Sequence, residues 1–203
     1  MFIAFEGIDG SGKSTQMKLL AERLESTGHK VHTTFEPTDG PVGSIIRNVM
    51  KGKMKADERT IAGLFVADRL DHLLNEGNGI LKKLNEGFIV ITDRYYFSSY
   101  AYHGTHMYMD WVIGANEMSA KILRPDINIF IDVSPEMAIQ RLNANRDEIE
   151  RYETLGNLKN VRDKYFESFE KLSEKEHILI LDGDRSLAMI AEDIWKELAP
   201  KFL

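Results

Sequence analysis

The chain contains no cysteine, no excess of basic residues and no long hydrophobic run. Without cysteine it can form no disulfide and no thiolate nucleophile. It has 26 lysines and arginines against 32 aspartates and glutamates, a net charge of -6, which argues against a general binder of nucleic-acid polymers. No apolar stretch is long enough to cross a bilayer, so we expect no membrane partner and a cytoplasmic location.

Short apolar runs alternate along the chain with stretches whose apolar residues recur at the period of a helix. The runs are nearly continuous in apolar character, which predicts strands buried on both faces of a sheet. The predicted strands are residues 2–5, 30–35, 88–92, 127–133 and 177–181. The predicted helical stretches are residues 16–24, 61–84, 161–172 and 187–198.

Residues 7–14 read G-I-D-G-S-G-K-S and match the pattern G-x-x-x-x-G-K-S directly after the first predicted strand. Glycines let backbone N–H groups approach a polyphosphate, and the first turn of the following helix adds positive potential. In such a loop Lys13 reaches the β- and γ-phosphates and the Ser14 hydroxyl ligates Mg²⁺. A glycine-rich turn with an unrelated lysine is the weaker alternative. The pattern therefore predicts an ATP-binding loop formed by Gly7, Ile8, Asp9, Gly10, Ser11, Gly12, Lys13, Ser14 and Thr15.

The alternation of strands and helices around this loop predicts an α/β fold of the P-loop type. We expect a three-layer sandwich, in which helices flank a five-stranded parallel sheet with right-handed crossovers. No repeat or low-complexity linker divides the chain, so residues 1–203 are interpreted as one domain.

The segment of about residues 143–153 is almost wholly polar and includes Arg146 and Arg151. One interpretation is a solvated surface. We favour a short lid, because phosphoryl transfer needs cations that a movable element can deliver.

Asp93 and Arg94 follow the third predicted strand, and ligands of open α/β sheets lie at the carboxyl ends of strands. Asp93 could hold Mg²⁺ through water or orient the loop. The planar guanidinium of Arg94 suits two phosphate oxygens. A structural ion pair at the strand end is the alternative, but the nearby phosphate loop favours a functional role.

Phe65 and Arg69 lie four residues apart in a predicted helix and therefore share a face. An aromatic ring with a guanidinium beside it can stack on a base and donate to its carbonyl. A core role for Phe65 is an equally good interpretation of this pair taken alone.

Over nearly its full length the chain resembles the thymidylate kinase family. Residues 5–16 resemble that family's F-E-G-x-D-x-x-G-K-S-T-Q loop, and residues 93–102 resemble its D-R-Y-x-x-S-x-x-A-Y segment. Glu36-Pro37 is similar to the E-P turn, residues 64–69 to the L-F-x-A-x-R helix, and residues 124–133 to the P-D-L-x-x-x-L-D-V strand. Several motifs in family order are more specific than the phosphate loop alone.

The resemblance implies an ATP-dependent nucleoside monophosphate kinase that converts dTMP to dTDP with Mg²⁺ during dTTP synthesis, and a homodimer. It implies that Phe65 stacks on thymine and that Arg69 reaches the O4 carbonyl, which would reject the amino group of cytosine. Arg94 would hold the acceptor phosphate, and Tyr102 would lie beneath the sugar. Asp9 would lie between the loop, the sugar 3′-hydroxyl and the metal, so Ser14 and Asp9 are the expected metal residues. The expected substrate-binding residues are Glu36, Arg47, Phe65, Arg69, Arg94, Ser98 and Tyr102.

The chain departs from the family pattern at several positions. Gly10 replaces a basic residue that some members carry in the loop, so the lid must supply the missing cation. Phe35 stands where many bacterial members have arginine, a loss that Arg47 could offset unless it only faces solvent, and His103 stands where glutamine is common. The expected catalytic residues are Asp9, Lys13, Arg94, Arg146 and Arg151, with Arg141 as a weaker lid candidate.

Two other functions fit the phosphate loop. One is a kinase for another deoxynucleotide or nucleoside, and the other is a P-loop switch that binds a nucleotide without transferring phosphate. The chain lacks the N-K-x-D motif of guanine-binding switches. Production of ADP that depends on an acceptor separates a kinase from a switch.

Overall fold

The computed structural model describes residues 1–145 and 154–202. Within them, five strands form one sheet whose neighbouring strands are all parallel, in the order β2-β3-β1-β4-β5. The strands are β1 (Phe2–Glu6), β2 (Val31–Phe35), β3 (Ile89–Asp93), β4 (Ile127–Asp132) and β5 (Ile178–Asp182). Each lies within one residue of its predicted bounds, so the predicted five-stranded parallel sheet is confirmed.

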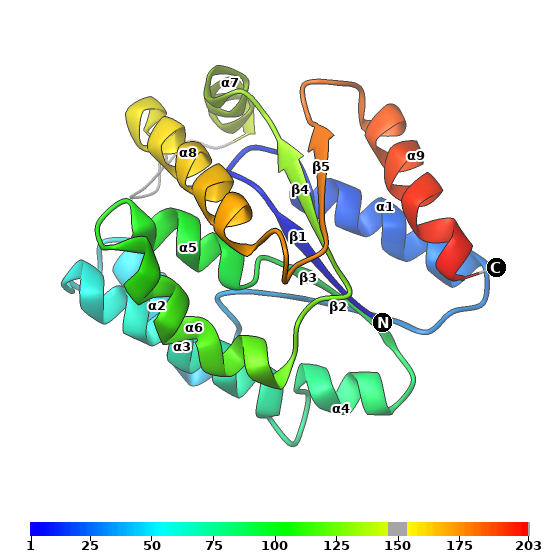
Figure 1. Ribbon diagram of the computed structural model, residues 1–203, viewed down its shortest axis with the longest axis horizontal. Helices are drawn as coiled ribbons and strands as arrows, with labels where there is room; N and C mark the ends of the chain where they lie inside the picture. The colour runs from blue at the N-terminus through cyan, green and yellow to red at the C-terminus, as the bar shows by residue number, and fades with distance from the viewer. Residues whose placement is uncertain (146–153, 203) are drawn as a thin grey trace.

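Helices cover both faces of this sheet. They are α1 (Lys13–Ser26), α2 (Pro41–Met50), α3 (Glu58–Leu74), α4 (Ile80–Asn85), α5 (Tyr96–Gly104), α6 (Met109–Ile122), α7 (Pro135–Asn145), α8 (Leu155–Leu172) and α9 (Leu187–Leu198), followed by the 3₁₀ turn Ala199–Lys201. Figure 1 shows α1 and α9 on one side of the sheet and α5 with α8 on the other. The predicted three-layer α/β sandwich is therefore confirmed.

Burial differs between the middle and the edges of the sheet. Every residue of β1 is buried, and β3 and β4 are buried except at their last residue. The edge strands β2 and β5 are only partly covered, and Phe35 and Ile180 are exposed. The prediction that all five strands are buried on both faces is wrong for these two, because an edge strand has a neighbour on one side only.

The predicted helical stretch 61–84 is two helices. The chain leaves α3 at Asn75, whose Oδ1 accepts hydrogen bonds from the backbone N–H groups of Gly77 at 2.9 Å and Asn78 at 3.3 Å. A Cβ at Gly79 would lie 2.5 Å from the carbonyl oxygen of Asn75, so the turn needs glycine there. The period of the apolar residues continued across this turn, which is why the sequence suggested one helix.

Of the predicted lid, residues 143–145 form the end of α7. Residues 146–153, which include Arg146 and Arg151, lie outside the described residues. Among the described residues, no helix combines the length and the apolar character needed to cross a membrane.

Candidate functional site

The phosphate loop joins the central strand β1 to α1 at the carboxyl edge of the sheet (Figure 1). Gly12 is the N-cap of α1 and has φ 90°, a left-handed conformation that glycine adopts without a steric cost. Gly10 has φ 80°, and a Cβ there would lie 2.5 Å from the carbonyl oxygen of Ala138 in α7. A basic side chain at position 10 is therefore incompatible with this placement of α7, which gives a steric reason for the departure seen in the sequence.

Lys13 and Ser14 begin α1 and face the cavity beyond the loop. Lys13 Nζ donates a hydrogen bond to the carbonyl oxygen of Ile8 at 3.1 Å. Burial, and then the positive charge of Arg94, lower the pKa of Lys13 to about 8. A buried ammonium with few oxygen partners is suited to an anionic ligand, which would restore its pKa.

Ser14 Oγ donates a hydrogen bond to Asp93 Oδ2 at 2.5 Å, which joins the loop to the end of β3. Magnesium prefers oxygen ligands and keeps several waters and substrate phosphates in its shell. The Ser14 hydroxyl with the carboxylates of Asp93 and Asp9 fits an ion of this kind. The described residues hold no cluster of three or more His, Cys, Asp or Glu suited to a metal. Magnesium at nucleotide sites is held by one or two carboxylates together with substrate phosphates.

Arg94 connects the phosphate loop to α5. Its backbone has φ 75°, which turns the side chain back across the end of β1. Nη1 donates to the carbonyl oxygen of Gly7 at 3.2 Å and to Ser98 Oγ at 2.9 Å. Nη2 donates to Asp9 Oδ1 and, at 3.2 Å, to the Tyr102 hydroxyl. The guanidinium carbon lies 4.9 Å from the centre of the Tyr102 ring, so this cation is fixed before any ligand binds.

Asp9 is the carboxylate partner of this arginine. Burial alone would raise the pKa of Asp9, but Arg94 and Lys13 reverse the effect and hold it below its usual value. The Tyr102 hydroxyl donates to Asp9 Oδ2 at 2.7 Å and accepts from the Asp9 backbone N–H at 3.2 Å. Asp9 is therefore ionised and oriented at neutral pH.

Two cavities meet at Asp9, Glu36 and Arg94, which line both. The large cavity, ≈ 790 Å³, is bordered by the phosphate loop, the end of β3, α7 and the start of α9. The small cavity, ≈ 110 Å³, is bordered by α3, α5 and the turn after β2. Its other lining residues are Pro37, Met50, Phe65, Arg69, Ser98, Ser99, Tyr102 and His103. This arrangement suits two ligands that meet at one point.

Most of the predicted loop residues line the large cavity, namely Asp9, Gly10, Gly12, Lys13, Ser14 and Thr15. Gly7, Ile8 and Ser11 do not line it. Ile8 is buried in the core, and a Cβ at Gly7 would lie 2.9 Å from the carbonyl oxygen of Ile131. These three contribute to the shape of the loop through its backbone.

Arg69 lies in the wall of the small cavity and is 1% exposed. Its Nε and Nη2 both donate to Glu36 Oε2, at 2.9 and 2.5 Å, and Nη2 also donates to the carbonyl oxygen of Tyr95 at 3.1 Å. Nη1 donates to Ser99 Oγ at 3.0 Å and to Asn116 Oδ1. A guanidinium has five N–H donors, and these five bonds engage all of them.

Phe65 and His103 form the aromatic part of the small cavity. Their ring centres lie 5.1 Å apart, with the planes tilted by 56°. Phe65 is only partly buried, so its ring can be covered by a ligand. The helical spacing that placed Phe65 and Arg69 on one face did bring both to the same cavity.

Arg47 is directed at the turn after β2 and lines neither cavity. Its Nη1 donates to the carbonyl oxygens of Pro37, at 3.1 Å, and Thr38, while Nη2 donates to Ser44 Oγ at 3.1 Å. The same turn is held from the other side by Asp68, whose carboxylate accepts two bonds from Thr38. The described contacts of Arg47 are therefore those of a residue that holds the turn.

Arg141 of α7 does line the large cavity. Its Nη1 donates to the carbonyl oxygen of Ser11 at 3.4 Å, and its Nη2 donates to that of Gly183 at 3.0 Å. Arg185, which precedes α9, lines the same cavity and pairs with Asp193 at 2.7 Å. Both cations line the large cavity and already have oxygen partners in the protein.

Sequence reasoning missed Glu6, the last residue of β1. Its carboxylate is buried and accepts bonds from the Tyr95 backbone N–H at 2.9 Å, Ser98 Oγ at 2.6 Å and the Tyr165 hydroxyl at 3.0 Å. Burial is the dominant influence and raises the pKa of Glu6 to about 7, although these donors and Arg94 oppose it. An acidic residue ending a wholly apolar strand was the available signal.

The chain is similar to proteins of one family across nearly its whole length. The family model described as thymidylate kinase matches residues 5–194. A probable thymidylate kinase of Methanocaldococcus jannaschii is 39% identical over 189 residues, covering 90% of this chain and 86% of that protein. One of Pyrobaculum calidifontis is 36% identical, covering 96% and 93%. A thymidylate kinase of Leptospira interrogans serogroup Icterohaemorrhagiae serovar Lai is 33% identical, covering 95% and 91%.

Proposed function

The chain belongs to the thymidylate kinase family of nucleoside monophosphate kinases, and we propose that it transfers the γ-phosphate of ATP to dTMP, giving ADP and dTDP. The observation that supports this most directly is the meeting of two cavities at Asp9 and Arg94. A phosphate loop borders one cavity, and an aromatic ring with a buried arginine borders the other. A transferred group at their junction would be in reach of both nucleotides.

The large cavity takes ATP in this proposal. Backbone N–H groups of the loop surround the β- and γ-phosphates, and Lys13 pairs with their oxygens. Mg²⁺, when bound with ATP, neutralises phosphate charge, and Ser14, Asp93 and Asp9 are the residues that would hold it. The hydrogen bond from Ser14 to Asp93 keeps the oxygens of these two residues together before the ion arrives.

The small cavity takes dTMP. Its phosphate binds Arg94 at the junction, thymine stacks on Phe65, and Tyr102 lies beneath the sugar, where it excludes a 2′-hydroxyl. Asp9 faces the sugar 3′-hydroxyl and the metal. The Glu36 carboxylate and Ser98 complete this wall by holding Arg69 and Arg94 in place.

Arg146 and Arg151 complete the site as lid cations in this proposal. Charge that develops on the transferred group needs compensation, and Gly10 supplies none. Arg141 lines the large cavity and is bonded to the loop through the carbonyl oxygen of Ser11.

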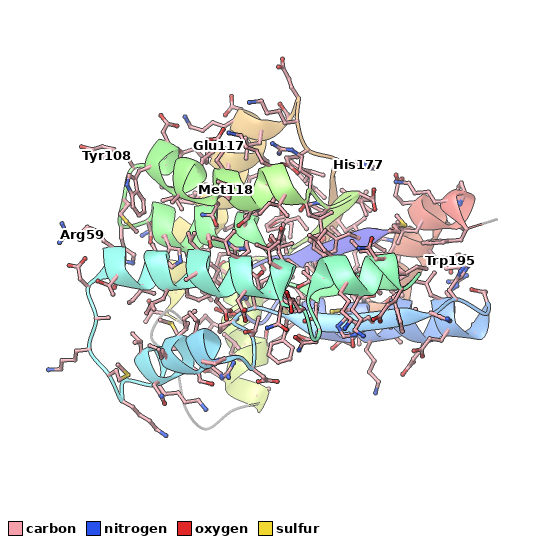
Figure 2. All side chains as sticks on the ribbon, turned by 90° about the horizontal axis from the view of Figure 1, so that it is seen from below. Arg59, Tyr108, Glu117, Met118, His177 and Trp195 are labelled. Atoms are coloured by element: carbon pink, nitrogen blue, oxygen red, sulfur yellow. The ribbon has the colours of Figure 1, made fainter. Side chains whose placement is uncertain are left out.

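We also propose a cytoplasmic homodimer, because the substrates are cytoplasmic nucleotides and α6 has an apolar exposed surface. Tyr108 is 90% exposed, Met118 60% and Trp111 49%. Figure 2 shows Tyr108 at the start of α6 and Met118 farther along it. Surfaces of this kind favour association between helices. Light scattering on the purified protein should give the mass of two chains.

An acceptor panel tests the proposed reaction. Purified protein with saturating Mg·ATP is offered dTMP, dUMP, the ribonucleotide TMP, dCMP and GMP in turn, and ADP is measured in each case. We expect dTMP to give the highest kcat/KM. A preference for another acceptor would indicate a different nucleotide kinase, and ADP formation without any acceptor would favour the P-loop switch.

A further inference from the structure

Arg94 has a buried neighbour in α8 to which neither the family resemblance nor the proposed function assigns a role. Tyr165 is fully buried, and its ring packs against that of Phe130, with 4.8 Å between the ring centres. Its hydroxyl lies 2.8 Å from Ser98 Oγ and 3.5 Å from Arg94 Nη1. No residue of α8 lines either of the two cavities that meet at Arg94, so Tyr165 reaches this cation from inside the protein.

The hydroxyls of Tyr165 and Ser98 both contact the Glu6 carboxylate. Ser98 Oγ donates to Glu6 Oε2 at 2.6 Å, and the Tyr165 hydroxyl lies 3.0 Å from the same oxygen. A guanidinium has only donors, so Ser98 Oγ accepts from Arg94 Nη1, at 2.9 Å. Because the Ser98 proton is directed at Glu6, the lone pairs of Ser98 are left for Arg94 and Tyr165. The four side chains therefore form one buried network.

The backbone of Arg94 gives a reason for this support. Among residues 1–145 and 154–202, Arg94 is the one non-glycine residue with a positive φ, at 75°. A residue with a side chain adopts this conformation at a cost and keeps it where its surroundings fix it. The position of the guanidinium then depends on the hydrogen bonds at its two terminal nitrogens.

These two nitrogens of Arg94 have different partners. Nη2 donates to Asp9 Oδ1 and to the Tyr102 hydroxyl, whereas Nη1 donates to the carbonyl oxygen of Gly7 and to Ser98 Oγ. An acceptor phosphate competes with Asp9, because both are anions that pair with a guanidinium. Once the phosphate has taken the place of Asp9 at Nη2, the bonds at Nη1 are the ones that still hold the cation to the protein.

We propose that Tyr165 is a positioning residue for phosphoryl transfer: acting through Ser98, its hydroxyl holds the Nη1 end of Arg94 in place while the acceptor phosphate binds at the Nη2 end. The inference rests on the proposed function, which places that phosphate at Arg94. Tyr165 lines neither cavity, so it touches no nucleotide. Its effect is therefore confined to the phosphate of dTMP and to the transfer step, and does not extend to thymine or to ATP.

The test is Tyr165→Phe, which removes the hydroxyl and keeps the ring. Calorimetry measures the binding of dTMP and of thymidine, which lacks the phosphate, at pH 8, above the pKa of Glu6 of about 7. We expect unchanged affinity for thymidine, whereas the gain in affinity that the phosphate provides falls ~5-fold, as for the loss of one net hydrogen bond. With dTMP, kcat should fall ~10-fold because the acceptor phosphate is aligned less well, and the KM for ATP should not change.

Tyr96→Phe is the matched control. Tyr96 is also fully buried, and its hydroxyl donates to another buried carboxylate, that of Glu176, at 2.7 and 2.8 Å. Glu176 precedes β5 and so lies at the edge of the sheet opposite the phosphate loop. Thermal melts should show a loss of stability in both variants, but Tyr96→Phe should keep the kcat and the affinities for thymidine and dTMP of the parent.

Ser98→Ala tests whether Tyr165 acts through Ser98. If it does, the double variant Tyr165→Phe/Ser98→Ala loses no more of the gain from the phosphate than Ser98→Ala alone. Additive losses would show that the two hydroxyls act independently, and would overturn the proposal.

The outcomes separate this proposal from the proposed function. Turnover of dTMP by the parent tests the function without reference to Tyr165. If the parent phosphorylates dTMP and Tyr165→Phe keeps both the kcat and the gain from the phosphate, the role of Tyr165 is wrong and the function stands. Equal losses of affinity for thymidine and dTMP would also overturn it, since they would indicate a purely structural tyrosine. If the parent does not phosphorylate dTMP, the proposed function fails and the inference falls with it.

Discussion

The two cavities bind their ligands by different means. The phosphate loop that borders the large cavity depends on its backbone: three of its glycines have positive φ, and the pKa of Lys13 beside it is lowered to about 8. The small cavity is formed by side chains that already bond one another, with Arg69 as the clearest case. In the large cavity the main charged partner of Lys13 would be the phosphate of the ligand. In the small cavity the side chains are held by one another before any ligand binds. The difference predicts which substitutions affect ATP and which affect dTMP.

Arg94→Ala should have the largest effect, because it removes the cation at the junction of the two cavities. We expect kcat/KM for dTMP to fall ~10³-fold, since the cation that binds the acceptor phosphate is lost and Asp9 loses its guanidinium partner. The KM for ATP should change much less. Arg23→Ala removes a surface ion pair with Glu192 and is the control. Equal losses for both nucleotides would show that the two cavities are not separable.

Arg151→Ala should lower kcat by ~10²-fold or more while leaving the affinity for dTMP nearly intact, as expected of a cation that acts only in the transition state. Arg146→Ala, made in parallel, shows which lid arginine dominates. Steady-state kinetics with both nucleotides gives the split between kcat and KM. An unchanged kcat in both variants would place the catalytic cation elsewhere, with Arg141 the next residue to test.

Gly10→Ala should weaken the binding of ATP and leave the binding of dTMP unchanged. The new Cβ would lie 2.5 Å from the Ala138 carbonyl oxygen, so α7 must move away from the loop. We expect the KM for ATP to rise ~10-fold with binding of dTMP unchanged. Gly87→Ala is a matched control: Gly87 also has positive φ, at 84°, but its Cβ would meet nothing within 4 Å. Both variants lose stability because of the backbone strain, and only Gly10→Ala should lose affinity for ATP.

Glu6→Gln should have the smallest effect on turnover and a clear effect on stability. The folded pKa of Glu6, about 7, lies above the ordinary 4.5, so between these pH values the folded state holds a proton that the unfolded state has lost. The free energy of unfolding therefore falls as pH rises through this window, by up to ~3 kcal/mol from this group. Urea titrations at pH 5 and pH 8 should show a loss in the parent that is smaller in Glu6→Gln. Identical pH dependence would mean that Glu6 titrates normally.

The contrast between the cavities also explains what the sequence could predict. The sheet and the loop follow from local patterns, since each strand and the loop glycines are contiguous in the chain. Phe65 and Arg69 could be paired from helical spacing alone. The sequence could not predict that every N–H donor of Arg69 already has a partner in the protein. These partners come from the turn after β2, from α5 and from α6, which are far apart in the chain. Arg47 was expected at the substrate from the resemblance to the family, and this stays a prediction; its described contacts are with the turn after β2 and with Ser44.

The break after α3 was missed for a different reason. The Asn75 side chain accepts a hydrogen bond from the backbone N–H of Gly77, and the spacing of apolar residues contains no sign of such a bond. The leucines on either side continue the helical period, so the sequence did not indicate the turn. The environments of Glu6 and His103 depend on burial, which the sequence does not give for a single polar residue. Glu6 occurs in a family segment and His103 directly follows one, yet their identity alone did not indicate an unusual environment.

The two cavities share Asp9, Glu36 and Arg94 in their walls. The affinity for one nucleotide therefore depends on whether the other is bound. A phosphate that draws Arg94 away from Asp9 alters the field met by the second nucleotide, and linkage requires the change to be equal in both directions. The coupling free energy between the two nucleotides is then the same whichever of them binds first, because it depends only on the free and bound states and not on the order of binding.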